Sequence, residues 1–232
     1  MTLRTFLLSL MIAFVSFGCS KETNAGKIGF WPWFESRESE FADLFSYETG
    51  AAAQNDEQVQ QKIEAAVKEL GDRLREIHPE FSPFFGSSEG TNELTVSVHG
   101  HAEHFKAVDD FIASAPKIGR WKFIALKQPL SLDPDTEIQS GGVKLKVRDW
   151  LYAKTRNPRG TFDFVVYVPA KVSDDEAGFQ RLFKSLIMDF LGERLASGVV
   201  GTVTVRELTA DIPAGLSPFT GIFQDASGEA GK

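Results

Sequence analysis

The period of the hydrophobic residues changes along the chain, and this change sets the class of fold that the chain can adopt. Over residues 56–78, apolar residues recur at steps of three and four, which indicates an amphipathic helix with Asp56 as its N-cap and Pro79 as its end. From Leu94 onward, apolar and polar residues alternate, which indicates a half-buried strand. The two periods in one chain predict a fold that combines helices and strands.

The second period opens a region, residues 92–219, in which strands and helices follow one another. We expect strands over residues 94–98, 121–126, 136–139, 143–147, 150–155, 162–168 and 201–208, and helices over residues 102–115 and 176–196. Turn residues at 140–142 and 157–160 predict hairpins. This order predicts an α+β domain with a mainly antiparallel sheet and two helices on one face, the split β-α-β arrangement of ferredoxin-like folds.

Residues 30–91 precede this domain and predict an aromatic segment followed by a helical arm. Four aromatic residues lie within residues 30–34, around Pro32, which favours an extended segment. Trp31 and Trp33 either pack on the chain's own domain or form a contact patch for another molecule, and we favour packing, because large exposed apolar patches are uncommon.

Three further segments complete the arm and the end of the chain. Residues 36–45 predict a short helix with its apolar residues on one face. Residues 82–92, which contain a proline and two glycines, predict a linker. Residues 220–232 contain few apolar residues and predict a loose tail.

Residues 1–18 have the pattern of a secretory signal peptide. Arg4 supplies a positive charge, and residues 6–17 form an apolar run of about a dozen residues, whereas a helix that spans a bilayer needs roughly 20. A small residue and then Cys19 follow this run. Residues 1–20 therefore resemble the signal peptide of bacterial lipoproteins, which is removed before a cysteine that carries lipid.

This resemblance implies that Cys19 is lipidated, with acyl chains such as palmitate, and that residues 19–29 tether the protein to a membrane. The bacterial cell envelope is then the expected location. Ser20, rather than an aspartate, follows the cysteine, which resembles lipoproteins of the outer membrane if the host is diderm. The alternative is a soluble secreted or periplasmic protein, if Cys19 belongs to an ordinary signal peptide.

A second resemblance begins at Glu93. The segments ELTVSV at residues 93–98, WKFIA at residues 121–125 and MDFLGE at residues 188–193 occur together in this chain. As a set, they resemble an uncharacterised bacterial α+β family of hypothetical proteins, over residues 93–216. The resemblance implies an antiparallel α+β fold and implies no activity or catalytic residue.

The composition disfavours nucleic-acid binding and leaves the fold without a disulfide. The formal net charge is −7, whereas a protein that binds nucleic acid needs a basic surface, so we expect no nucleic-acid partner. Cys19 is the single cysteine, so no disulfide can form within one chain. A core supplied by 20 Phe and four Trp must therefore be held by packing alone.

Three of the four histidines lie close together, at His99, His101 and His104. If a strand ends at His99 and a helix follows, the three imidazoles can converge on a metal ion, and Glu103 or Asp109 can add an oxygen ligand. The alternative is a row of exposed histidines on a polar turn, which we favour because the spacing matches no standard zinc motif. The three histidines are the candidate metal ligands, and we expect no other cofactor.

Asp189 and Glu193 lie four residues apart on the helix expected over residues 176–196. Paired carboxylates can perform acid-base chemistry, but the same spacing fits a solvated helix edge, which we favour. The sequence contains no nucleophile, P-loop or dinucleotide motif. We therefore assign no catalytic residue.

These observations favour a membrane-anchored envelope lipoprotein whose α+β domain binds a protein partner or a small ligand. The alternative is a hydrolase-type enzyme that uses carboxylates and His99, His101 and His104, with or without a metal. A deep pocket with converging carboxylates or histidines would favour the enzyme, and a flat aromatic face near Trp31 and Trp33 would favour the binding protein.

Overall fold

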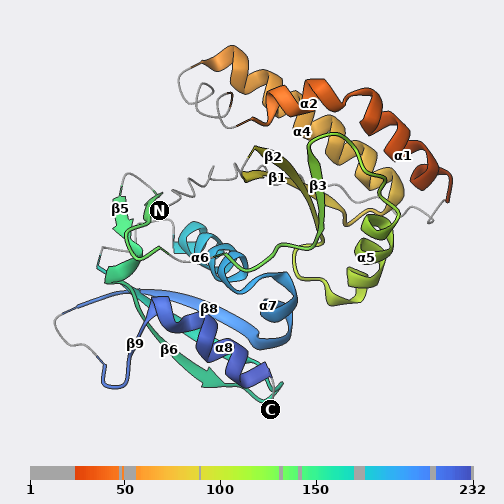
Figure 1. Cartoon of the computed structure of the whole chain (residues 1–232). Helices are drawn as coiled ribbons and strands as arrows, with labels where there is room; N and C mark the ends of the chain where they lie inside the picture. The colour runs from red at the N-terminus through yellow and green to blue at the C-terminus, as the bar shows by residue number, and fades with distance from the viewer. Residues whose placement is uncertain are drawn as a thin grey trace. The chain divides into compact units, whose positions relative to one another are not determined.

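The computed structural model describes residues 24–46, 49, 56–88, 90–130, 133–140, 143–169, 176–209 and 213–230. The predicted signal peptide and Cys19 lie outside these residues. The chain divides into two compact units, of which unit 1 extends to Lys127 and unit 2 begins at Gln128. The described residues form seven α-helices and three small sheets, so the fold is α+β, as the sequence predicted (Figure 1).

The described part of unit 1 contains four α-helices and one three-stranded sheet. In chain order, its elements are α1 (Asn24–Ser36), α2 (Glu38–Leu44), α4 (Glu57–Ile77), β1 (Ser82–Ser88), β2 (Thr91–Ser97), the 3-10 turn η1 (Ala102–His104), α5 (Phe105–Ala113) and β3 (Trp121–Ala125). β1 and β2 pair antiparallel, whereas β2 and β3 pair in parallel. A parallel pair requires a crossover connection, and α5 lies in that connection.

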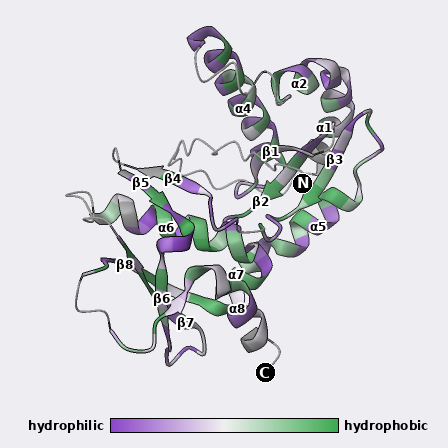
Figure 2. Cartoon of the chain, turned by 60° about the vertical axis from the view of Figure 1, so that its left-hand side comes forward, coloured by the Kyte–Doolittle hydropathy of each residue, from purple (hydrophilic) through white to green (hydrophobic). Residues whose placement is uncertain are grey.

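The helix predicted over residues 56–78 is confirmed as α4. The Oδ1 atom of Asp56 accepts hydrogen bonds from the backbone N–H groups of Gln58 and Val59, at 2.9 and 3.2 Å, so Asp56 is the N-cap. Leu70 and Leu74 are fully buried, and hydrophilic residues cover other parts of the helix surface (Figure 2). One side of α4 therefore packs on the core of unit 1.

The linker predicted over residues 82–92 is wrong, because most of it forms β1 and the turn into β2. Pro83 has no N–H for an inner strand, but β1 lies at the edge of the sheet, where proline is tolerated. Gly90 has a φ of 78° in the turn. The ring of Phe85 stacks on that of Phe45, with centroids 3.6 Å apart, so packing against the arm holds the strand in place.

The extended conformation predicted around Pro32 is also wrong, because Pro32 lies inside α1. The helix places Phe30, Trp31 and Phe34 in the core, with exposed fractions of 3, 6 and 0%. Burial of a large apolar side chain contributes about 1.5 to 3 kcal/mol. Three such side chains together outweigh the roughly 3 kcal/mol that a proline costs inside a helix.

The arm and the first sheet share one hydrophobic core, so the structure differs from the predicted boundary between residues 30–91 and 92–219. Phe34 contacts the rings of Trp121 and Phe123 on β3, with centroids 5.0 and 5.4 Å apart. Residues from α1, α2, α4, α5 and the sheet belong to the same buried cluster. The division of the chain falls instead after Lys127, inside the predicted α+β domain.

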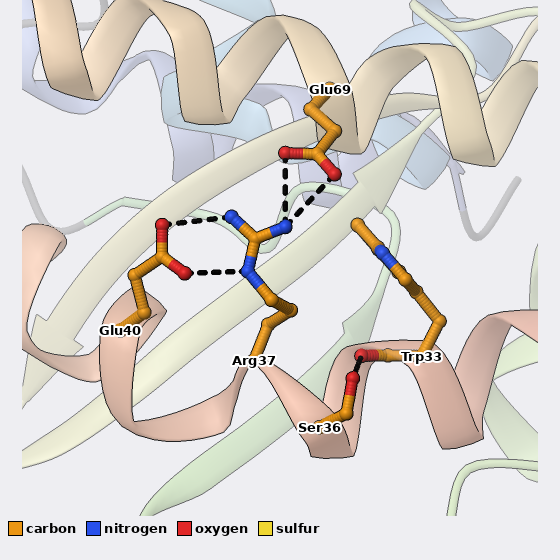
Figure 3. Close-up of polar contacts among 5 residues, drawn as sticks. All are labelled: Trp33, Ser36, Arg37, Glu40 and Glu69. Atoms are coloured by element: carbon orange, nitrogen blue, oxygen red, sulfur yellow. Dashed lines mark hydrogen bonds and ion pairs between the residues drawn. The ribbon is translucent and has the colours of Figure 1, made fainter.

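An ion-pair cluster connects the helices of the arm (Figure 3). The Arg37 guanidinium lies between two carboxylates, with Nε 2.5 Å from Glu40 Oε2 and Nη1 2.9 Å from Glu69 Oε1. Glu40 lies on α2 and Glu69 on α4, so one side chain joins two helices. The hydrogen bonds from Arg37 lower the pKa of Glu40 below its usual value.

We expect this cluster to make unit 1 sensitive to acid. Because the pKa of Glu40 is lower in the folded state than in the unfolded state, its contribution is present above the unfolded value and is lost as the pH falls through the folded value. The Glu40 side chain is 51% exposed, so we expect the effect to stay below about 1 kcal/mol. Urea unfolding at pH 7 and pH 3 should show a smaller loss of stability for Glu40→Gln than for the parent. The matched control is Glu35→Gln on α1, and an identical loss for Glu40→Gln and the parent would contradict the prediction.

Unit 2 contains the remaining helices and two sheets. In chain order, its elements are β4 (Glu137–Ser140), β5 (Val143–Lys146), η2 (Val147–Asp149), β6 (Leu151–Arg156), β7 (Phe162–Val168), α6 (Glu176–Leu191), α7 (Glu193–Val199), β8 (Val200–Glu207), β9 (Ser217–Pro218), η3 (Phe219–Gly221) and α8 (Ile222–Ala230). β4 pairs with β5, and the second sheet has the order β8-β7-β6-β9. Both predicted hairpins, β4-β5 and β6-β7, are confirmed.

The structure does not show the single, mainly antiparallel, ferredoxin-like sheet that the sequence predicted. The described strands belong to three sheets in two units, and each unit contains a parallel pair, β2 with β3 and β7 with β8. In both units, a hairpin is followed by a helical crossover and then by a strand parallel to the second hairpin strand. Hydrophobic alternation identifies strands but does not reveal their partners.

Two predictions near the end of the chain are also corrected. The helix expected over residues 176–196 is interrupted at Gly192, which has a φ of 74° and separates α6 from α7. The loose tail expected over residues 220–232 is wrong for residues 222–230, because they form α8. Ile222 and Ala226 of α8 are buried together with Phe219, so three apolar residues at helical spacing are enough for packing.

Candidate functional site

The carboxyl ends of β2 and β3 form the candidate site in unit 1. Because these two strands are parallel, both end at the same edge of the sheet. In sheets with parallel strands and helical crossovers, ligands bind beyond the carboxyl ends of the strands. The chain leaves β2 toward η1 and α5 and leaves β3 toward Lys127, so both connections begin at this edge.

Both strands end in a strained backbone conformation. Among the described residues, the non-glycine residues with a positive φ are His99, at 54° just after β2, and Leu126, at 61° directly after β3. The N–H of Leu126 donates to the carbonyl of Val96, at 2.9 Å, and holds the two strand ends together. Strained residues cost about 1 to 3 kcal/mol each and cluster at functional sites.

All four histidines of the chain lie at this edge. His78 follows the last turn of α4, His99 follows β2, His101 precedes η1 and His104 is its last residue. The ring centroid of His104 is 4.6 Å from that of His78 and 6.3 Å from that of His101. The Nε2 atom of His99 lies 2.9 Å from the hydroxyl oxygen of Ser82, so His99 is directed to the start of β1.

Hydrogen bonds orient two of these groups. The backbone N–H of Glu80 donates to Nδ1 of His78, at 3.3 Å, so the proton of the neutral imidazole is on Nε2. Nδ1 of His101 lies 3.6 Å from a carboxylate oxygen of Glu103. A backbone hydrogen bond at Glu103, and then the contact with His101, lower the pKa of this carboxyl group.

His99 also borders the sheet face opposite to the one that carries Phe85 and Phe123. The helices pack through aromatic contacts on the face that carries Phe85 and Phe123. On the opposite face, Phe84 is half-buried, the Lys127 ammonium lies 3.8 Å from the centre of its ring and the His99 ring lies 5.8 Å away. The site therefore combines an aromatic ring with cationic and imidazole groups.

The structure brings together only part of the predicted metal set. His101 and His104 are neighbours, but His99 turns to Ser82, and His78 completes the row instead. Within the described ranges, no group of three or more His, Cys, Asp or Glu residues is placed to hold a metal ion. Sequence analysis missed His78 because its segment was interpreted as the end of a helix followed by a linker. In the structure, the chain turns from α4 directly into β1, and this turn places His78 at the edge.

The other predicted site residues lie elsewhere. Trp31 is buried, its ring stacks on Phe111 at 4.7 Å, and its Nε1 donates to the Ser114 hydroxyl at 3.0 Å. Trp33 is half-buried beneath the Arg73 guanidinium, 5.2 Å from its ring centre. The packing favoured for the aromatic segment is therefore found for Trp31.

The carboxylate pair lies in unit 2, and its two members differ in environment. Glu193 is only 1% exposed and begins α7, whereas Asp189 is half-buried near the end of α6. The break at Gly192 places the two residues on different helices. The solvated edge favoured from the sequence is therefore wrong for Glu193.

Comparisons with known proteins add no assignment. No protein-family model matches the chain, and no curated protein is similar enough to be matched. The resemblance over residues 93–216 stays a prediction. None of the helices in the described part of the chain is long and apolar enough to cross a membrane.

Proposed function

We propose that this protein is a lipid-anchored bacterial envelope protein whose unit 1 binds a protein partner or small ligand at the carboxyl edge of β2 and β3. The observation that carries the binding site is the convergence of both strained residues, His99 and Leu126, with all four histidines at one edge. The observation that carries the anchor is the order of Arg4, the apolar run and Cys19 in the sequence.

The groups at the edge suit a partner that offers oxygen acceptors beside an apolar surface. The Lys127 ammonium and the imidazole N–H groups are donors, and the half-buried ring of Phe84 supplies an apolar contact. A carboxylate or carbonyl group on the partner would match the donors. Such a site recognises its partner by hydrogen bonds and packing and requires no reaction.

We expect Cys19→Ser to release the protein from the membrane. A lipidated cysteine holds the chain through acyl chains, each buried methylene of which contributes about 0.8 kcal/mol. Fractionation of cells that express the parent and the variant should place the parent in the membrane fraction and the variant in the soluble fraction. The matched control is Ser20→Ala, which changes the neighbouring side chain and keeps the cysteine. Unchanged membrane retention of Cys19→Ser would contradict the proposal.

We expect His99→Asn combined with Lys127→Gln to reduce partner binding by about tenfold or more, because truncation of an interface anchor commonly costs more than about 1.4 kcal/mol. Asparagine tolerates the positive φ at position 99, so the backbone is preserved. The measurement is affinity capture from solubilised membranes, quantified by mass spectrometry for each captured partner. The matched control is Lys122→Gln, an exposed lysine that pairs with Glu93. Equal capture by the double variant and the control would contradict the site.

The alternative is a hydrolase-type enzyme, with or without a metal ion, and the row formed by His78, His104 and His101 favours it. Two of these imidazoles belong to the metal set predicted from the sequence, and the ring centroids are 4.6 and 6.3 Å apart. Side-chain rotations would be needed to bring their nitrogens to about 2.0 Å from one zinc ion, because no group of the described residues is placed to hold a metal ion. Calorimetric titration with zinc separates the two proposals, since saturable binding that His104→Ala abolishes would favour the enzyme.

A further inference from the structure

α1 runs antiparallel to α4, which fixes where the amino end of α1 lies in unit 1. The Arg73 guanidinium of α4 lies over the ring of Trp33, 5.2 Å from its centre. Four residues later, directly after the end of α1, Arg37 pairs with Glu69, which lies one turn earlier in α4. The amino end of α1 therefore lies on the same side of unit 1 as the carboxyl end of α4. The two helices lie side by side in Figure 1, and their contacts confirm this.

The amino end of α1 reaches the edge of unit 1 that carries the histidines. Asn24 is nine residues before Trp33, which corresponds to about 13 Å along a helix. α4 ends at Ile77, only four residues after Arg73, or about 6 Å. The start of α1 therefore extends about 7 Å past the end of α4, beyond His78, on the side of the turn that leads into β1. This is the edge at which β2 and β3 end.

Only four residues separate Cys19 from Asn24. Whatever their conformation, the five Cα steps cannot span more than about 18 Å. A lipid on Cys19 places that residue at the membrane surface. The start of α1 then stays within about 18 Å of the lipid-bearing residue, and the end of α4, where the histidine edge begins, lies about 7 Å further along the helix axis.

We infer that the histidine edge of unit 1 is turned toward the lipid surface, so that the candidate site works in the narrow space next to the bilayer. The inference rests on the proposed lipidation of Cys19, and the occupant that it assigns to this space is the headgroup layer of the anchoring membrane. The opposite edge, with the amino end of α4, lies one helix length away, about 30 Å for its 21 residues. A partner that reaches the site must therefore itself lie at the membrane surface.

Two cysteine variants test the orientation, because the two introduced residues lie near opposite ends of α4. Glu80→Cys places a thiol beside the histidine edge, and Gln60→Cys places one on the first turn of α4, and both positions are exposed. In the lipidated protein, Cys19 is a thioether, so the introduced cysteine is the single free thiol. Each variant is labelled with a fluorophore and reconstituted in phospholipid vesicles that contain a headgroup nitroxide. The labelled parent measures background reaction at Cys19.

Because the two labels are separated by about 30 Å, we expect the quenching at position 80 to be at least about threefold greater than at position 60. Equal quenching, or greater quenching at position 60, in vesicles that carry the protein would overturn the orientation and leave the anchor intact. Flotation of the vesicles is measured first. Failure of the parent to float with them would overturn the anchor, and the orientation with it.

Discussion

Replacing Gly192 with alanine is expected to destabilise unit 2 by about 3 kcal/mol, because the added methyl group meets both an unfavourable backbone conformation and a steric clash. Gly192 has a φ of 74°, and a Cβ atom there would lie 2.7 Å from Cδ and 2.8 Å from the backbone nitrogen of Pro129. With a ψ of 153°, Gly192 has a backbone conformation that is essentially restricted to glycine and costs another residue about 1 to 3 kcal/mol. The clash adds to this cost because the backbone at Pro129 cannot rotate away. Urea unfolding of the whole chain, followed by circular dichroism, measures the change.

Gly198→Ala is the matched control, because it adds the same methyl group six residues later in the same unit. A Cβ atom at Gly198 meets nothing within 4 Å, and the residue lies inside α7. Alanine is favoured over glycine in a helix by up to about 1 kcal/mol, so we expect a small gain in stability. Similar free energies of unfolding for the two variants would show that Gly192 is not required at the break between α6 and α7.

Gly192 also illustrates what the sequence could and could not predict. The periodicity of residues 176–196 correctly identified helical residues, because apolar side chains at steps of three and four must share one face. The break depends on the approach of Pro129, which lies more than sixty residues earlier in the chain. Local sequence patterns contain no information about such a contact. The same argument applies to α8, which packs because Phe219 and Ile222 meet the core of unit 2.

The elements predicted best are those whose signals are local. Asp56 caps α4 through its own backbone neighbours, and both hairpins in unit 2 follow turn residues that lie between their strands. The elements predicted worst are β1 and α1, in which Pro83 and Pro32 indicated other conformations. In α1, packing of aromatic residues such as Phe34 outweighs the local preference of the proline. In β1, the edge position tolerates Pro83, and Phe85 packs on Phe45.

The candidate site was also predicted only in part, and again the local features were predicted best. The sequence predicted that His99, His101 and His104 lie between the end of a strand and the start of a helix, and they lie between β2 and α5. Their relative directions depend on η1 and on the start of β1, where Ser82 meets His99. His78 joins them only because the chain turns back from α4 into β1. A set of ligands or contacts from different elements requires the tertiary fold.

Trp31→Ala is expected to destabilise unit 1 by about 3 to 5 kcal/mol, the range for removal of a fully packed aromatic side chain. Trp31 is 6% exposed, stacks on Phe111 and donates a hydrogen bond to Ser114. The substitution leaves a cavity and removes the donor from that hydroxyl group. Because Trp31 contributes to fluorescence, thermal unfolding is followed by circular dichroism at a helix wavelength.

Trp33→Ala is the matched control for the same residue type two positions later. Trp33 is half-buried, and its contact with Arg73 is a cation–π interaction near the surface, worth about 0.5 to 1 kcal/mol. We therefore expect a clearly smaller loss of stability than for Trp31→Ala. If both variants unfolded like the parent, the aromatic segment would not belong to the core of unit 1. The antiparallel alignment of α1 with α4 would then lose its support. The orientation of the histidine edge toward the membrane, which depends on this alignment, would lose its support as well.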